Sequence, residues 1–173
     1  EVFDSPVIGR CQIHKLRNVR DHLPEKMRGP VTKRIRKAYH ADSALAAEAM
    51  LEALAKELDK TQPGAAGSLR EGMAETLIVL RLDLPPTLAR TFRSTNAVES
   101  MISISRDHSR NVKWWRDGQM AMRWCAAGML EASKQFRRVN GHLHLPALRA
   151  ALERHVGVES VRADCNTQDV SAA

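Results

Sequence analysis

The sequence predicts a mostly helical protein. Aromatic residues make up only 4% of its 173 residues, whereas alanine, leucine and methionine are common, and these residues favour helices over strands. Apolar residues recur at steps of three and four along several segments, which is the spacing of one helix face. Only residues 7–11 have the β-branched character of a strand. The chain is long enough for one compact domain or for a piece of a larger one.

In the first half of the chain, a helix is expected from Gln12 until Pro24 stops it. The next helix spans about residues 25–40, although Pro30 indicates that it begins only there. The clearest helix covers about residues 43–60, with Asp42 and Ser43 as natural N-caps. Its apolar stripe is formed by Ala47, Leu51, Leu54 and Leu58. A fourth helix should follow the break at residues 62–64 and continue to about Leu80, before the prolines at 85 and 86.

In the second half, residues 87–94 are expected to be irregular. A helix should begin at Asn96 and end near Asp107. A longer helix is predicted over residues 117–139, with a stripe formed by Met122, Cys125, Met129, Ala132 and Phe136. A shorter helix over residues 145–155 precedes a polar tail, residues 157–173, which we expect to be disordered.

The net charge of +7 is unevenly distributed along the chain. Ten lysines and arginines lie between residues 10 and 37, where the acidic residues are Asp21 and Glu25. A basic block on an otherwise nearly neutral protein favours a polyanionic partner such as DNA. A solvated helix face is the alternative. The residues expected to contact phosphates here are Lys15, Arg17, Arg20, Lys33, Arg34, Arg36 and Lys37.

A second basic segment, residues 106–116, contains tryptophans. Arginine suits phosphate oxygens and tryptophan can stack on an exposed base. The alternative is that Trp114 or Trp115 packs in the core while the arginines stay exposed. Trp124, inside the long apolar helix, is expected in the core. The cations expected to contact DNA here are Arg106, Arg110, Lys113 and Arg116.

Two motifs narrow the function further. The first, Cys11-Gln12-Ile13-His14-Lys15-Leu16-Arg17-Asn18, is a C-x-x-H-K-x-x-N element. The second, Ser94-Thr95-Asn96-Ala97-Val98-Glu99, is an [ST]-[ST]-N-x-[IV]-E element. In this order, with Cys11, His14 and Asn96 as motif residues, they resemble the C-terminal part of Mutator-type DDE transposases of bacterial insertion sequences. The resemblance spans about residues 2–150.

The resemblance implies the C-terminal part of an RNase H-like α/β catalytic core with a helical insertion. Residues 1–24 would then hold the end of a core strand and a helix, residues 25–86 the insertion, and residues 87–156 the last core helices. Glu99 matches the third catalytic carboxylate of the family, which binds Mg²⁺ or Mn²⁺ with two aspartates and promotes phosphodiester cleavage and strand transfer. The implied partners are transposon-end and target DNA and further copies of the protein.

Glu99 has a simpler interpretation. Asn96-x-x-Glu99 resembles a capping box, in which the carboxylate only caps a helix. The two aspartates of the family lie upstream of the C-x-x-H element, and Asp4 is too close to Cys11 to match either. We therefore expect this chain alone to be inactive. A non-catalytic basic nucleic-acid-binding module and a helical protein-interaction domain are the alternatives to a transposase.

Cys11 and His14 form half of a tetrahedral zinc pattern, but we do not expect zinc, because only Cys125, His142 or His144 could complete it. The odd cysteine count does not suggest a disulfide framework. No secretory leader or membrane span is evident. The resemblance implies a bacterial cytoplasmic protein associated with the nucleoid.

Overall fold

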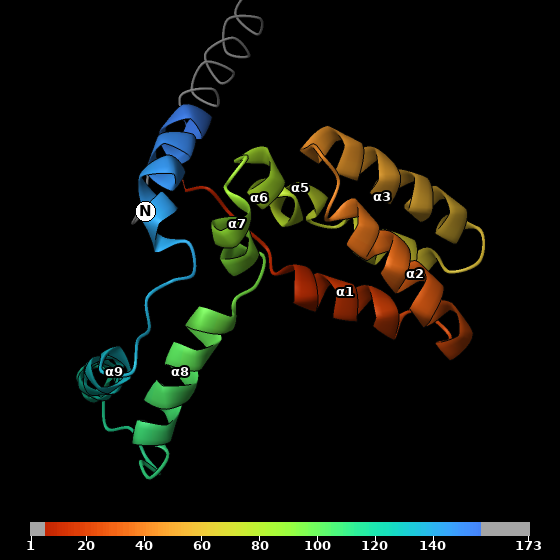
Figure 1. Ribbon diagram of the computed structural model, residues 1–173. Helices are drawn as coiled ribbons and strands as arrows, with labels where there is room; N and C mark the ends of the chain where they lie inside the picture. Colours follow the sequence, from red (N-terminus) through yellow and green to blue (C-terminus); the bar gives the residue numbers. More distant parts are fainter. Residues whose placement is uncertain (1–5, 157–173) are drawn as a thin grey trace, which may run out of the picture. The chain divides into compact units, whose positions relative to one another are not determined.

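The structure, a computed structural model, describes residues 6–156. Helices form all of the regular structure in this range, so the mostly helical prediction is confirmed (Figure 1). The chain divides into two compact units, one made of Glu1–Arg93 with Asn140–Ala173 and the other of Ser94–Val139. Within the described range, no helix is long and apolar enough to cross a membrane. The predicted disordered tail, residues 157–173, lies outside the described residues.

The core of the first unit lies among four helices, α1 (Gln12–Asp21), α2 (Glu25–Ala38), α3 (Ala44–Asp59) and α4 (Pro63–Arg70). Helix α3 packs against α2 and α4, and α1 packs against α4. The predicted α3 stripe is buried, as are Val31 and Ile35 of α2. The Oγ of Ser43 accepts the backbone N–H of Ala46 at 3.1 Å, which confirms the predicted N-cap. Helix α2 begins at Glu25, with Pro30 inside it, not at Pro30 itself.

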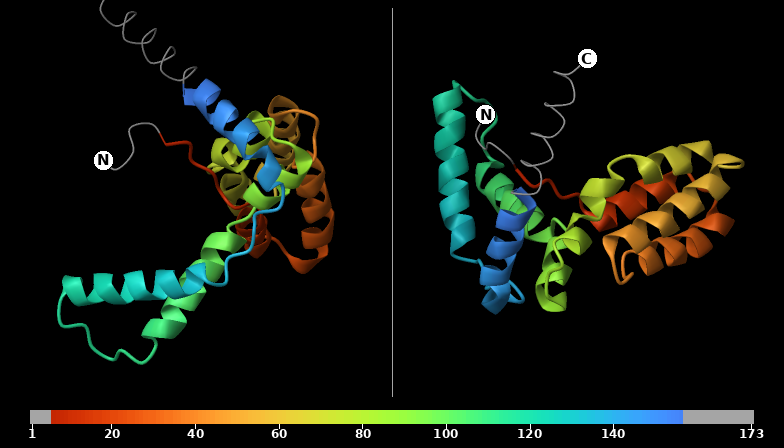
Figure 2. Two further views of the ribbon diagram at one scale, coloured as in Figure 1. Left: turned by 60° about the vertical axis from the view of Figure 1, so that its left-hand side comes forward. Right: turned by 90° about the horizontal axis from the view of Figure 1, so that it is seen from above.

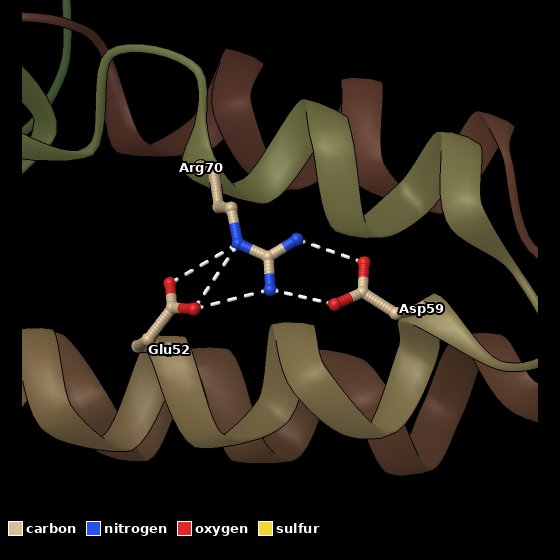
Figure 3. Close-up of polar contacts among 3 residues, drawn as sticks. All are labelled: Glu52, Asp59 and Arg70. Atoms are coloured by element: carbon tan, nitrogen blue, oxygen red, sulfur yellow. Dashed lines mark hydrogen bonds and ion pairs between the residues drawn. The ribbon is translucent and has the colours of Figure 1, made fainter.

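Arg70 joins α3 to α4 (Figure 3). Its guanidinium donates to both carboxylate oxygens of Asp59, at 2.7 and 2.8 Å, and to Glu52 at 3.1 and 3.2 Å. Two carboxylates of α3, one near its middle and one at its end, thus accept hydrogen bonds from the same guanidinium, that of the last residue of α4. These hydrogen bonds lower the pKa of Asp59 and raise that of Arg70. The ion pair fixes how α4 lies along α3.

The predicted strand at residues 7–11 was wrong for the part of the chain that the structure describes. These residues are not helical, but they have no neighbouring strand to pair with. The backbone N–H of Arg10 instead donates to the carbonyl of Glu75 at 3.1 Å, and that of Gln12 to Arg93 at 2.9 Å. A β-branched sequence extends the backbone, but only a second strand makes it part of a sheet.

The predicted helix ending near Leu80 is divided into α4, α5 (Met73–Thr76) and α6 (Ile78–Arg81). The break lies at Gly72, whose φ of 60° is left-handed. A Cβ at this position would lie 2.4 Å from Nε of Arg10, so the Arg10 side chain passes directly over the glycine.

Residues 87–94 were predicted to be irregular, but most of them are helical. Helix α7 spans Pro86–Phe92, because a proline at the first helical position is pre-organised for a helix.

The second unit is a helical hairpin of α8 (Asn96–Ser109) and α9 (Gly118–Ser133), which pack against each other and cross at an angle in the left view of Figure 2. The Asp117 side chain caps α9 by accepting the N–H of Met120 at 2.6 Å. Helix α9 ends at Ser133, six residues before the predicted end at Val139. Phe136 is 57% exposed, so packing within the unit does not favour a longer helix.

The predicted burial along α9 was largely wrong. Trp124 is 37% exposed and Met122 64% exposed, and Cys125 is exposed as well. Of the predicted stripe only Ala132 is buried, because α8 covers a narrow strip of α9 around Gly128 and Ala132.

In the first unit, the chain continues with the 3₁₀ helix His142–His144 and helical residues 145–156, which confirms the helix expected there.

Candidate functional site

Glu99 lies in the first turn of α8 and its side chain is exposed. Its backbone N–H donates to the carbonyl of Thr95 at 2.9 Å, and the Thr95 hydroxyl donates to its carboxylate. Thr95 is the N-cap and Asn96 the first helical residue, so Asn96 is not the cap that the capping-box interpretation requires. Thr95 therefore holds an accessible carboxylate at the start of the helix.

Glu99 offers a single carboxylate to a divalent ion. A carboxylate oxygen is a suitable ligand for Mg²⁺ or Mn²⁺. Within residues 6–156, however, no group of three or more histidine, cysteine, aspartate or glutamate side chains could hold a metal ion. Glu99 thus fits as one ligand, and a metal site that used it would need its other ligands from outside the described residues.

Cys11 and His14 belong to the first unit. Cys11 is buried as the N-cap of α1, and His14 is partly buried one turn into that helix. Burial raises the pKa of the Tyr39 phenol, and the negative charge that Cys11 carries when ionised raises it further. The first motif therefore positions the start of α1 in the helical core.

Lys15 does not lie on the surface, which corrects its place among the expected DNA contacts. Its side chain is 4% exposed, and its ammonium donates to the Ser68 carbonyl of α4 and to the Glu71 carboxylate, the latter at 3.4 Å. Glu71 also accepts Arg10 at 2.6 Å. The sequence carried a signal for this burial, because Cys11, Lys15 and Val19 are spaced by four residues and share the inward face of α1.

Carboxylates also hold two cations of α2. Arg34 makes a two-pronged ion pair with Glu57 of α3 at 2.5 and 2.7 Å, and Arg28 pairs with Glu25 at 2.5 Å. Several exposed cations of α1 and α2 have no ion pair within the described part of the chain. These unpaired cations are Arg17, Arg20, Lys26, Lys33, Arg36 and Lys37.

Three of the unpaired cations follow one line along α2. Lys26, Lys33 and Lys37 are spaced by seven and four residues, and the buried residues Val31 and Ile35 occupy the opposite face. Arg36 flanks this line. We call these four residues the α2 ridge. The ridge gathers positive charge that no carboxylate of the described chain neutralises.

The end of α8 and the segment that joins it to α9 present the second set of cations. Arg106, Arg110, Lys113 and Arg116 are all exposed, and Arg116 contacts Asp117 at 3.1 Å. Trp114 is 72% exposed and Trp115 43% exposed. The interpretation in which one of these rings fills the core was therefore wrong. Both tryptophans and the cations beside them are accessible.

Comparison with known proteins assigns the chain. Residues 1–139 match the family model described as "Transposase, Mutator family". This chain belongs to the Mutator family of transposases. Two curated relatives agree: the transposase for insertion sequence element IST2 of Acidithiobacillus ferrooxidans is 28% identical over 104 residues. The transposase for insertion sequence element ISRM5 of Rhizobium meliloti (strain 1021) is 26% identical over 149 residues. No solved structure matches significantly.

The alignment with the IST2 protein covers 60% of this chain and 34% of that relative. The alignment with the ISRM5 protein covers 86% of this chain and 37% of that relative. The chain thus spans about a third of the length of these Mutator-family relatives. The family match at residues 1–139 includes both motifs, Glu99 and both sets of cations, whereas helical residues 145–156 lie beyond it.

Proposed function

We propose that this chain contributes Glu99 to metal-dependent DNA cleavage and strand transfer in a complete Mutator-family transposase. The observation that carries the proposal is an exposed carboxylate, held by Thr95 at the start of α8, inside the family match. We also propose that the chain belongs to an RNase H-like core, with residues 25–86 as its helical insertion. The core strands would then come from another part of the complete protein.

Glu99 would act as one ligand of a Mg²⁺ or Mn²⁺ site, together with two aspartates outside this chain. Bound divalent ions at such a site activate the attacking hydroxyl and stabilise the leaving oxygen in an in-line displacement. The role of this chain's own residues is positional. The Thr95 hydroxyl bonds to the carboxylate and restricts its rotation, so that an oxygen of Glu99 is presented in one orientation.

DNA would contact the chain through two exposed cationic surfaces. One is the α2 ridge with Arg17 and Arg20, and the other is the segment Arg106–Arg116, which runs from the last turn of α8 toward α9. The unpaired state of the ridge supports this, because a cation already held by a carboxylate gains less from a phosphate. Binding through phosphates depends steeply on salt and little on sequence. The exposed rings of Trp114 and Trp115 suit stacking on unpaired bases.

One observation favours a second candidate, a basic nucleic-acid-binding module without catalysis. The bond between Thr95 and Glu99 gives the carboxylate a structural function at the helix start, which requires no metal. In that case the function of the chain would be to bind nucleic acid through its cationic surfaces, without cleaving it.

The two candidates are separated by comparing this chain with a longer protein that includes the preceding segment of the complete transposase. The proposal predicts Mg²⁺-dependent cleavage of element-end DNA by the longer protein and none by this chain alone, while both bind DNA. Cleavage by the isolated chain, or none by the longer protein despite tight binding, would refute the catalytic proposal. DNA binding by both proteins without cleavage is the result that the non-catalytic module predicts.

A further inference from the structure

Arg90 and Arg93 form a pair of neighbouring cations for which the described chain supplies no counter-charge. Both lie in the first unit, Arg90 in the last turn of α7 and Arg93 as its C-cap. Residues three apart on a helix have side chains on the same face. Neither guanidinium makes an ion pair or a side-chain hydrogen bond within residues 6–156, and between Asp83 and Glu99 the sequence contains no acidic residue.

Arg93 is the more unusual of the two. Its Nε is buried and has no hydrogen-bond partner among residues 6–156. Burial, and then the charge of the neighbouring Arg90, lowers the pKa of Arg93. Arginine nevertheless stays charged in proteins, so Arg93 cannot avoid the free-energy cost of its partly buried charge by losing a proton. An unsatisfied donor on a permanent cation, beside a second cation, favours the binding of an anion.

The backbone around Arg93 is held in place, so the pair is pre-organised. The carbonyl of Arg93 accepts the N–H of Gln12 at 2.9 Å, and its own N–H donates to Ala89 at 3.1 Å. Gln12 is buried and its side chain donates to the carbonyl of Thr76 at 3.2 Å. Arg93 is therefore tied to the start of α1 on one side and to α7 on the other.

We propose that Arg90 and Arg93 bind one backbone phosphate of DNA. A guanidinium fork matches the geometry of phosphate oxygens, and two adjacent forks can share one phosphate. The site rests on the proposed function for its partner, DNA. It adds a contact six residues before Glu99 in the sequence, separate from the α2 ridge and from the segment Arg106–Arg116.

The direct test observes Arg93 Nε–H by nuclear magnetic resonance in the 173-residue chain. Its signal is assigned by its absence from the spectrum of Arg93→Lys. A short DNA duplex and sodium phosphate are titrated separately. The proposal predicts that the duplex shifts this signal saturably and slows its exchange with water, and that free phosphate shifts it in the same direction only at much higher concentration.

Three results would overturn the site in different ways. If the duplex saturates the chain and shifts other signals but not that of Arg93, the site is wrong, while DNA binding by the proposed function stands. If phosphate shifts Arg93 but the duplex does not, the assignment to DNA is wrong. If the duplex shifts no signal at all, both the site and the proposed DNA contacts fail.

Variants provide a second readout, the dependence of DNA affinity on salt. Each lost phosphate contact reduces the slope of log K against log salt by about 0.9. Because Arg90 and Arg93 share one phosphate, the double variant Arg90→Gln with Arg93→Gln should show this full reduction, and Arg93→Gln alone should show a smaller one. Arg93→Lys, which keeps the charge but loses the fork, should lie between Arg93→Gln and the wild type. Arg149→Gln is the matched control, because Arg149 is exposed and paired with Glu153 at 2.9 Å. A wild-type slope in Arg93→Gln would contradict the site.

Discussion

Ser105 of α8 and Gly128 of α9 mark the point where the two helices of the hairpin come closest. A Cβ at position 128 would lie 2.5 Å from Oγ and 2.9 Å from Cα of Ser105. These two residues and Ala132 are the buried residues of the hairpin helices. The glycine is therefore required by the close approach of α8, and this approach holds in place the helix that carries Glu99.

Gly128→Ala should destabilise the hairpin by about 1–3 kcal/mol, because the added methyl group meets the backbone of Ser105, which cannot rotate away. Faster hydrogen exchange of the α8 and α9 amides would report the loss, since the two units can open separately. The control is Gly118→Ala in the same helix, where a Cβ meets nothing within 4 Å. Equal exchange rates in the two variants would show that the close approach does not exist.

Lys15→Met should lower stability without affecting DNA binding. The change leaves the partly buried carbonyl of Ser68 without its ammonium donor, which costs about 1–3 kcal/mol. Lys33→Met is the matched control, because Lys33 is exposed on the α2 ridge. That variant should unfold like the wild type in urea but bind DNA more weakly, with a smaller salt dependence. The opposite assignment of the two effects would place Lys15, not Lys33, on the DNA-binding surface.

Tyr39→Phe should leave stability unchanged or raise it by up to about 1 kcal/mol. The Tyr39 hydroxyl is buried and has no hydrogen-bond partner within the described part of the chain. Removing an unsatisfied polar group removes its desolvation cost. Urea unfolding of the two proteins measures the difference. A clear loss of stability in the variant would mean that the hydroxyl is hydrogen-bonded in solution.

Acid should weaken the first unit. Arg70 lowers the pKa of Asp59, Arg34 lowers that of Glu57, and Arg10, followed by Lys15, lowers that of Glu71. A carboxyl whose folded pKa lies below its unfolded value stabilises the protein above the unfolded value, which is about 4. That contribution is lost as the pH falls through the folded pKa. Thermal midpoints should therefore decrease as the pH falls below about 4.

Asp59→Asn should make the decline in midpoint between pH 6 and pH 3 shallower, because one of these contributions is then missing at every pH. Asp42→Asn is the control, since Asp42 is exposed and makes no ion pair within the described residues. If Asp59→Asn and the wild type decline equally, the bond between Asp59 and Arg70 does not form in solution.

Features encoded by near neighbours could be predicted from the sequence. Ser43 and Asp117 cap their helices through residues three positions later, and the α3 stripe follows from helical spacing. Features that depend on distant partners could not. Residues 7–11 need a second strand, Lys15 is buried because α4 supplies a carbonyl and Glu71, and Trp124 is exposed because α8 covers only a strip of α9.

The same distinction applies to the candidate site. The motif placed Glu99 in the first turn of a helix, and the structure agrees. The Thr95 hydroxyl bond and the unpaired Arg90 and Arg93 were not predicted, since burial and pairing depend on the whole fold. The sequence also overestimated the available cations, because Arg10, Arg28 and Arg34 are held by carboxylates.

The most direct test of the account measures cleavage of element-end DNA by the complete transposase carrying Glu99→Gln, with Asp107→Asn on the same helix as the control. Glutamine keeps the shape of the side chain and an oxygen that can accept the Thr95 hydroxyl, but it removes the charge that a divalent ion needs. We expect Glu99→Gln to bind DNA normally and to cleave about 10²–10³-fold more slowly, the scale of losing a charge-stabilising group. Asp107→Asn should cleave like the wild type. Wild-type cleavage by Glu99→Gln would contradict the account and leave Glu99 as a structural residue at the start of α8.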